Sequence, residues 1–323
     1  MRSPRNIFSF IFHSIVALCI SVTYSYFFER FLSRCKGKKI FLNVFLLPFV
    51  NNIVSCIIYG FSMITLRKNR KFTLSSEELK HAFLSGFYES SSTLFSHYSL
   101  QYISYPLKII FSSAKILFAI PASIIITTFQ SSGNSKKSFK KYEIIISFVM
   151  FIGLVVVLLP IGSAPGLLEN FSIKGASLIF VSINLGCFYD QHQMLLLRSL
   201  QSTPVALFWN SLFALCCTSI LIITLGDIKQ VISTLTNLQE LVPIIIISCH
   251  HTLSQFFLAS LKRKYGIFWK NVVASLRRCI SLIISIVLFG HSVTIQQACG
   301  ITIVLTCVFL AGNAETKNRN REK

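Results

Sequence analysis

The stretch WKNVVASLRRCISLIISIVLFG, residues 269–290, is almost wholly apolar, yet it carries Arg277 and Arg278 side by side near its middle. About twenty apolar residues are enough for a helix to cross the hydrocarbon core of a bilayer. A cation at the centre of such a helix costs on the order of 2.5–3.5 kcal/mol on insertion scales. The two arginines therefore predict a watery cavity, an anionic partner, or both, at the depth of the membrane.

Similar apolar runs recur along the whole chain. Of its 323 residues, 53% are hydrophobic and only 13% are charged, whereas a soluble domain carries roughly a quarter charged residues. We therefore expect an all-α polytopic membrane protein that lies in the lipid bilayer. The polar breaks predict about ten transmembrane helices, at residues 6–28, 40–65, 80–102, 105–128, 142–161, 173–195, 204–225, 241–261, 266–290 and 293–313.

The positions of the basic residues along the chain are typical of a membrane protein. A formal net charge of +20 is also found in proteins that bind nucleic acid, but here the cations form short clusters between apolar runs. We therefore expect no nucleic-acid partner. Most Lys and Arg fall in one alternating set of loops, which includes both ends of the chain, so both termini are expected in the cytosol. The basic loop from Arg30 to Lys39 belongs to the other set and is a local exception.

Motifs for metal, redox and ATPase chemistry are missing from the sequence. The ten cysteines contain no CxxC pair, so we expect neither disulfides nor a metal site. Cys249 is followed by His250 and His251, which point to different faces of a helix, and we interpret them as structural. No glycine-rich phosphate loop is present. The sequence therefore predicts no cofactor and no catalytic residue.

Two predicted helices repeat one spacing of cations. In YPLKIIFSSAKILFAIPASIII, residues 105–126, Lys108 and Lys115 lie seven apart, and in the ninth helix Lys270 and Arg277 also lie seven apart. Seven residues are close to two helical turns, which puts each pair on one face. The match between the fourth and ninth helices indicates an internal repeat of five helices.

A repeat of five helices has a consequence for topology. An odd number of spans places the second copy upside down relative to the first, so we predict a 5+5 inverted repeat. Its halves are residues 1–165 and residues 166–323, the second with a short basic cytosolic tail. In such proteins the solute site lies near the midplane, between the halves.

The cations outnumber the acidic residues that could neutralise them. Glu29, Glu89 and Asp190 lie within or at the ends of predicted helices and could neutralise three of these cations. The fourth and ninth helices together carry five Lys and Arg residues, so internal pairing leaves positive charge over. Arginine binds phosphate through paired donors and lysine through a point charge. The surplus predicts a multiply anionic ligand such as a nucleotide conjugate.

The fourth helix and the residues before it resemble the nucleotide-sugar transporters of the drug/metabolite transporter superfamily. In SHYSLQYISYPLKIIFSSAK, residues 96–115, the residues that match the family pattern S-N-x-x-L-x-Y-x-x-Y-P and its later lysine are Ser96, Leu100, Tyr102, Tyr105, Pro106 and Lys115. His97 replaces the usual asparagine. The resemblance is to the branch with UDP-galactose, UDP-N-acetylglucosamine and PAPS (3'-phosphoadenylyl sulfate) transporters.

The resemblance extends to the ninth helix and covers nearly the whole chain. The residues that match there are Gly266, Arg277, Arg278, Ser285, Phe289, Gln297 and Gly300, while Gln193, Gln255, Tyr24 and Glu29 match elsewhere. The chain departs from the family at Ala274-Ser275-Leu276, which replaces threonines before the arginine. It also departs at Phe28, where the branch has glutamine. Gly186 stands where the sixth helix usually has an acid, and Asp190 follows one turn later.

The resemblance implies a secondary antiporter rather than an enzyme. Such a protein moves a nucleotide-sugar, with a UDP-sugar first, from the cytosol into the Golgi or endoplasmic reticulum lumen, in exchange for a nucleoside monophosphate. PAPS is the alternative solute. Lys115, Arg277 and Arg278 are expected to contact phosphates, and Lys108 and Lys270 to attract the anion from either side. Four residues are expected at the base or sugar: Tyr102, Tyr105, Gln193 and Gln255.

Other functions stay open at this point. A membrane-embedded transferase would use His250 or His251, and a non-transporting scaffold would keep the fold while losing the solute. The sequence also leaves open which nucleotide-sugar is carried and whether the chain forms a homodimer.

Overall fold

The structure is a computed structural model. It describes residues 5–34, 39–65, 74–103, 141–158, 172–200, 202–225 and 228–267, together with isolated residues and short groups within 108–118, 269–280 and 295–310. Every element in the described residues is helical, which confirms the all-α prediction.

Seven of the predicted spans correspond to helices. The elements before residue 160 are α1 (Arg5–Arg34), α2 (Lys39–Thr65), α3 (Ser76–Tyr98), the 3-10 turn η1 (Ser99–Gln101) and α6 (Lys141–Leu158). Those after residue 170 are α7 (Ile173–Leu200), α8 (Thr203–Leu225), α9 (Ile228–Thr236) and α10 (Leu238–Tyr265). The predicted spans 105–128, 266–290 and 293–313 lie largely outside the described residues, so the total of ten helices stays a prediction.

Capping moves the start of the third helix. The predicted start was residue 80, but α3 begins at Ser76 because Ser75 and Glu78 form a capping box. The Ser75 hydroxyl accepts from the Glu78 amide at 3.3 Å, and the Ser75 amide donates to the Glu78 carboxylate at 2.8 Å. These two bonds satisfy backbone donors that a helix start otherwise leaves exposed.

Two predicted loops are helical. The GDIKQ break becomes the nine-residue helix α9, and Asn237 then caps α10 by accepting from the Gln239 amide at 3.1 Å. The KRKYG break, residues 262–266, was predicted as a loop on the cytosolic side, and the prediction of a loop is wrong. Helix α10 continues through Lys262 and ends at Tyr265, where Gly266 adopts φ = +97°, a backbone conformation that favours glycine.

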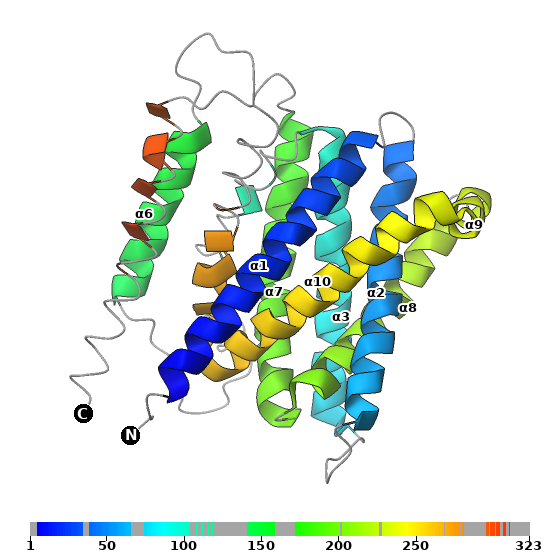
Figure 1. The fold of residues 1–323 in the computed structure, drawn as a ribbon, viewed down its shortest axis with the longest axis horizontal. Helices are drawn as coiled ribbons and strands as arrows, with labels where there is room; N and C mark the ends of the chain where they lie inside the picture. The colour runs from blue at the N-terminus through cyan, green and yellow to red at the C-terminus, as the bar shows by residue number, and fades with distance from the viewer. Residues whose placement is uncertain are drawn as a thin grey trace.

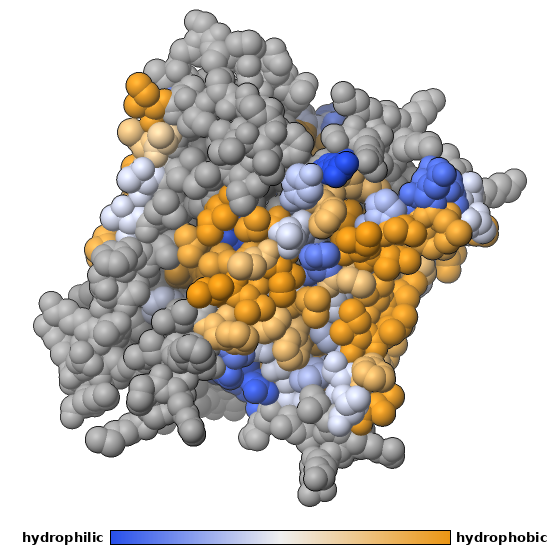
Figure 2. All heavy atoms as spheres, viewed as in Figure 1, coloured by the Kyte–Doolittle hydropathy of each residue, from blue (hydrophilic) through white to orange (hydrophobic). Residues whose placement is uncertain are grey.

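The outer surface suits a bilayer. Within the described residues, three helices are long and apolar enough to span one, at Phe45–Thr65, Thr203–Thr224 and Leu238–Tyr265. Figure 2 shows hydrophobic side chains gathered in a broad band across the described helices of one face. Large apolar side chains such as Phe61 and Ile223 are exposed. In water such a surface would be unfavourable, whereas in lipid it is the expected exterior.

The helices pack in pairs that join the early part of the chain to the late part. Helix α1 lies along α10, α2 packs on α8, and α3 packs on α7 and α8. Figure 1 shows α1 and α10 running diagonally across the more upright α3 and α7, with α6 at one edge. One buried core cluster joins α1, α2 and α10, with Phe28, Leu46 and Ile247 among its members. This arrangement brings α1, α3, α7 and α10 around a common space.

Candidate functional site

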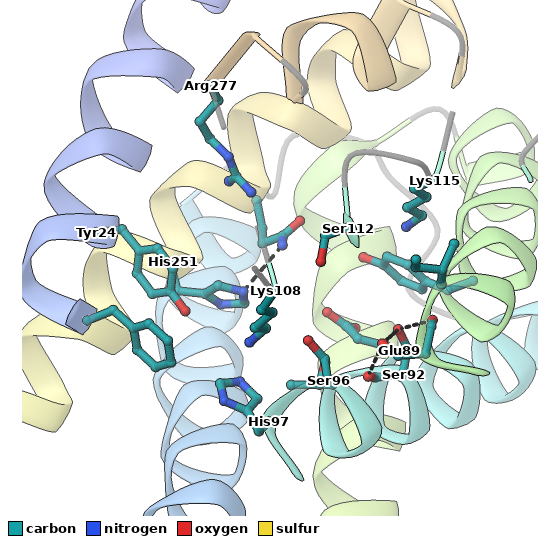
Figure 3. A pocket seen from close by; sticks show the side chains of 17 residues that line it. Tyr24, Glu89, Ser92, Ser96, His97, Lys108, Ser112, Lys115, His251 and Arg277 are labelled. Carbon is teal, nitrogen blue, oxygen red and sulfur yellow. Dashed lines mark hydrogen bonds between the residues drawn. The ribbon is translucent and has the colours of Figure 1, made fainter. Parts of the chain in front are cut away.

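A cavity of about 260 Å³ lies among α1, α3, α7, α10 and the described residues that follow α3 and α10 (Figure 3). One buried water needs only about 10–15 Å³ of such space, so the cavity has room for many waters. Most of its wall is polar, with several serines, two histidines and three cations. The structure therefore has a polar hollow inside the helix bundle that is large enough to take water.

The fourth predicted helix presents one face to this cavity. Lys108, Ser112 and Lys115 line it, and their spacings of four and three residues put them on the same helix face. Phe111 and Phe118 pack instead against the buried apolar side chains of α7. The alternation of polar and aromatic residues in KIIFSSAKILF thus divides a cavity face from a packed face.

One end of the cavity, here called the aromatic end, is built around Tyr24 and Phe28. These two rings stack with their centroids 5.7 Å apart, and His97 meets the edge of Phe28 at 5.5 Å. His251 lies 5.6 Å from Tyr24 and is 3.3 Å from the Gln255 amide nitrogen. The aromatic end therefore offers flat apolar surfaces together with hydrogen-bonding groups.

Two cations project into the aromatic end. The Lys108 ammonium lies 5.5 Å from the centre of the Phe28 ring, and in the described part of the chain no carboxylate lies within 4 Å of it. Nη1 of Arg277 is 3.5 Å from the hydroxyl of Ser254, a long contact. Figure 3 shows both side chains on the same side of the cavity as His251.

The other end, here called the serine end, lies between α3 and α7. Ser92 donates to the backbone carbonyl of Ser182 at 2.8 Å, and Ser182 donates to that of Ser92 at 2.7 Å. Glu89 also faces this end, where its carboxylate accepts a hydrogen bond from Asn210. Lys115 completes it, with its ammonium 5.9 Å from the centre of the Tyr189 ring.

Behind the serine end, one carboxylate holds three lysines. Asp190 is fully buried, and its oxygens lie 2.9 Å from Lys115, 2.6 Å from Lys262 and 2.8 Å from Lys270. We call this group the Asp190 cluster. Gln193 supports it by accepting from Lys262 and donating to the Tyr189 hydroxyl at 2.6 Å.

The structure brings four of the nine predicted site residues to the cavity and leaves three away from it. Lys108, Lys115, Arg277 and Gln255 line the cavity. Lys270 is held in the Asp190 cluster instead of facing solvent or solute, so its expected role of attracting the anion does not fit its position.

The remaining predicted residues lie elsewhere. Gln193 is in the Asp190 cluster, and Tyr102 packs on buried side chains of α7, with its hydroxyl 3.5 Å from that of Tyr98. Arg278 and Tyr105 lie outside the described residues.

The acidic residues that could pair with the cations behave differently from one another. Asp190 does neutralise lysines, whereas Glu89 bonds Asn210, and the side chain of Glu29 is outside the described residues. Internal pairing is therefore real, but it coexists with a polar cavity that Lys108, Lys115 and Arg277 all reach. Among the described residues, no cluster of His, Cys, Asp and Glu could hold a metal ion.

Several cavity residues were not predicted from the sequence. His251 was interpreted as structural, but it lines the cavity because α10 turns that face inward. Tyr24 and Phe28 are four apart and share a face of α1, a signal that was available but ambiguous in so apolar a helix. Lys262 was assigned to a cytosolic loop, yet its side chain is only 1% exposed and belongs to the Asp190 cluster.

The comparisons with known proteins agree on one family. The family model described as "UAA transporter family" matches residues 7–315. Solute carrier family 35 member B1 of Dictyostelium discoideum is 24% identical over 66% of this chain and 54% of its own length. The chain thus spans about half of that relative.

Two further relatives align over most of the chain. Adenosine 3'-phospho 5'-phosphosulfate transporter 1 of Homo sapiens and that of Pongo abelii are 19% and 20% identical, over 91% of this chain and 67% of theirs. One solved crystal structure is similar with a TM-score of 0.61 at 12% identity, covering 94% of this chain and 96% of that one. At that identity the likeness concerns the fold alone.

Proposed function

The chain belongs to the UAA transporter family, and from this premise we propose that it is a secondary antiporter. Its proposed cargo is a nucleotide-sugar, with a UDP-sugar first, carried from the cytosol into the Golgi or endoplasmic reticulum lumen. A nucleoside monophosphate would leave in exchange. Its family and two of its relatives are named as transporters, which supports a transport function rather than an enzymatic one.

The observation that carries this proposal is the set of cations on the cavity wall. Lys108, Lys115 and Arg277 approach one polar space from the residues that follow α3 and α10. Phosphate groups are the natural counter-ions for arginine and lysine, and a phosphorylated solute in this cavity would be within reach of all three side chains. We place the phosphates of the solute among these three residues, with Arg278 as a further contact.

The rest of the cavity suits the uncharged parts of a nucleotide conjugate. The stacked rings of Tyr24 and Phe28 and the amide of Gln255 offer a flat surface and polar edges to a base. The hydroxyls of Ser92 and Ser96 and the carboxylate of Glu89 offer hydrogen-bond partners to sugar hydroxyls. We therefore assign the base to the aromatic end and the sugar to the serine end.

The pattern of helix contacts supports the inverted repeat on which alternating access depends. In a 5+5 repeat, α1, α2 and α3 would correspond to α7, α8 and α10. If each helix is replaced by its counterpart, a contact between α1 and α10 predicts one between α7 and α3. A contact between α3 and α8 likewise predicts one between α10 and α2. The contact between α2 and α8 predicts itself. All five pairs are in contact. Rocking of one half against the other around the cavity would expose it to each side in turn.

PAPS is the second candidate solute. Two relatives that align over most of the chain are named as adenosine 3'-phospho 5'-phosphosulfate transporters. PAPS carries its 3'-phosphate apart from its 5'-phosphosulfate. The cations also occupy two ends of the cavity, Lys108 and Arg277 at one and Lys115 at the other. A solute with two separate anionic groups would engage both.

Transport by the purified protein in lipid vesicles tests the proposal. Vesicles preloaded with UMP, with GMP, with AMP or with adenosine 3',5'-bisphosphate are offered labelled UDP-galactose, UDP-glucose, UDP-N-acetylglucosamine, GDP-mannose and PAPS. We expect one of these donors to enter, and faster into vesicles preloaded with its matching nucleotide. A labelled lipid or sugar product would indicate a transferase instead, and binding without uptake would indicate a scaffold.

A further inference from the structure

The Asp190 cluster has more positive than negative charge. Three ammonium groups lie within 2.9 Å of the oxygens of one carboxylate, and Lys270 reaches both oxygens at 2.8 Å. Two of these positive charges have no counter-charge inside the cluster. A purely structural ion pair needs one lysine for one carboxylate, so the additional lysines call for an explanation.

The three lysines differ in their access to the cavity. The side chains of Lys262 and Lys270 are 1% and 10% exposed and do not line the cavity. The side chain of Lys115 is 16% exposed and does line it. Of the three, Lys115 alone therefore belongs to both the cluster and the cavity.

Gly186 keeps the space beside the Lys115 ammonium open. It lines the cavity on α7, one turn before Asp190. A Cβ atom at this position would lie 3.0 Å from the Lys115 ammonium and 3.0 Å from the Ser92 hydroxyl. The ammonium thus has Asp190 on one side and unfilled cavity on the other, so a modest rotation would carry it from the carboxylate to a solute.

Lys115 and Asp190 each keep a partner of opposite charge when Lys115 moves from Asp190 to a phosphate. In the empty cavity Lys115 is neutralised by Asp190 at 2.9 Å. When Lys115 turns to a phosphate, Asp190 keeps Lys262 and Lys270 as partners. Removing one partner of a buried ion pair is strongly unfavourable because the other charge is left alone. The two additional lysines avoid that penalty.

We propose that Asp190 is a positioning residue that competes with the transported anion for the ammonium of Lys115, while Lys262 and Lys270 hold Asp190 in place. This inference rests on the proposed function, since it takes the solute to be a phosphorylated anion in the cavity. Lys115 lies in residues 1–165 and the other members in residues 166–323. Solute binding therefore breaks an ion pair that joins the two parts of the chain, which couples occupancy of the cavity to their relative motion.

Equilibrium binding to the purified full-length chain tests the competition. The probes are labelled UMP and labelled adenosine 3',5'-bisphosphate. Asp190→Asn removes the competing charge, so the Kd of the probe that binds should fall by about fivefold or more, the usual lower range of coupling between linked groups. In a Lys115→Met background the same substitution should change Kd by less than about twofold, because the residue through which Asp190 acts is gone.

Glu240→Gln is the control. Glu240 is a carboxylate in the first turn of α10 that does not line the cavity. A gain in affinity equal to that of Asp190→Asn would show a general effect of net charge and overturn the proposal. Equal effects of Asp190→Asn with and without Lys115 would also overturn it.

Asp190→Asn removes the carboxylate partner of the buried Lys262 and Lys270 and so can prevent folding. A second measurement therefore uses the wild-type protein. A structure with bound nucleotide should show Lys115 more than 4 Å from Asp190, with Lys262 and Lys270 still in contact. An intact Lys115–Asp190 pair beside a bound phosphate would overturn the inference while leaving the antiporter proposal standing. Failure of folded wild-type protein to bind either probe would overturn both.

Discussion

The two ends of the cavity hold their lysines in opposite ways. At the aromatic end, Lys108 lies over the ring of Phe28, with no carboxylate within 4 Å in the described part of the chain. At the serine end, Lys115 is 2.9 Å from Asp190. The first has no carboxylate partner among the described residues, so a solute can supply its counter-charge directly. The second is neutralised by the protein itself until a solute takes it.

The lysines at the two ends contribute differently to the binding of an anion. A cation without a carboxylate partner raises the affinity of the empty site directly, but it lowers the stability of the empty protein. A shared cation adds less affinity, because the solute must first displace Asp190, but it makes the protein respond to occupancy. A transporter that must release its cargo on the far side is served by both properties.

The largest expected effect comes from Arg277 at the aromatic end. Arg277→Ala should lower uptake about 100-fold, because paired donors to a phosphate are lost and hydrogen bonds to charged groups are worth roughly 1.5–3 kcal/mol each. Arg277→Lys should lower uptake by an intermediate factor, because a planar guanidinium with paired donors is replaced by a single ammonium group. Initial rates in vesicles with equal amounts of folded protein measure this. Wild-type uptake by Arg277→Ala would remove it from the site.

Replacing Lys108 and replacing Lys115 should have similar effects on nucleotide affinity but different effects on protein stability. Lys108→Met and Lys115→Met should each weaken nucleotide binding about tenfold, the lower end of charged hydrogen bonds. Lys108→Met should also raise the thermal unfolding temperature of the empty protein, since a cation without a carboxylate partner is removed. Lys115→Met should raise it less, because Lys115 is already paired with Asp190 in the empty protein. Equal shifts in unfolding temperature for both variants would erase the contrast between the two ends.

Gly186 gives a smaller effect confined to the serine end. In Gly186→Ala the added methyl meets Lys115 and Ser92 at 3.0 Å, so Lys115 must shift. Uptake should fall by about three- to tenfold while the protein still folds, since closely packed sites tolerate an added methyl poorly. Gly60→Ala is the control, because its methyl would meet only Phe208 at ordinary contact distance, 3.4 Å. Loss of uptake in both variants would point to general helix packing.

The smallest expected effect is at Tyr102. The hydroxyl of Tyr102 lies near that of Tyr98, and the residue does not line the cavity. Tyr102→Phe should therefore change the uptake rate by less than about twofold, the scale of one exposed hydrogen bond. Saturation kinetics in vesicles measure it. A tenfold rise in KM would return Tyr102 to the binding site, where the family resemblance had placed it.

Much of the fold follows from the apolar runs, and its details follow from residues between them. Runs of about twenty apolar residues predicted seven of the described helices, with boundaries that differ by up to six residues, at the end of α1. The boundaries that failed depend on polar groups: Ser75 and Glu78 begin α3 early, and α10 runs on through Lys262. A cluster of cations predicts a loop from sequence alone. Here it marks the end of a helix whose inward face meets Asp190.

For the site, spacing along one helix was informative and partners across helices were not. Lys108, Lys115 and Arg277 were predicted from cations placed deep in apolar helices, and all three line the cavity. Lys270 follows the same spacing as Lys108, but it faces the buried carboxylate of α7. Periodicity identifies the residues that share a helix face, but it does not identify what that face contacts. His251 and Tyr24 were missed for the same reason.

One measurement addresses the central claim, that cations on the cavity wall bind the phosphates of the cargo. It is the ratio of affinities for the nucleotide that the protein exchanges and for the same nucleoside without its phosphates. We predict that the nucleotide binds at least about 100-fold more tightly, as expected for several charged hydrogen bonds, and that the ratio collapses when Lys108 and Arg277 are both replaced by methionine. Equal affinities for nucleotide and nucleoside, or a ratio unchanged in the double variant, would contradict the account.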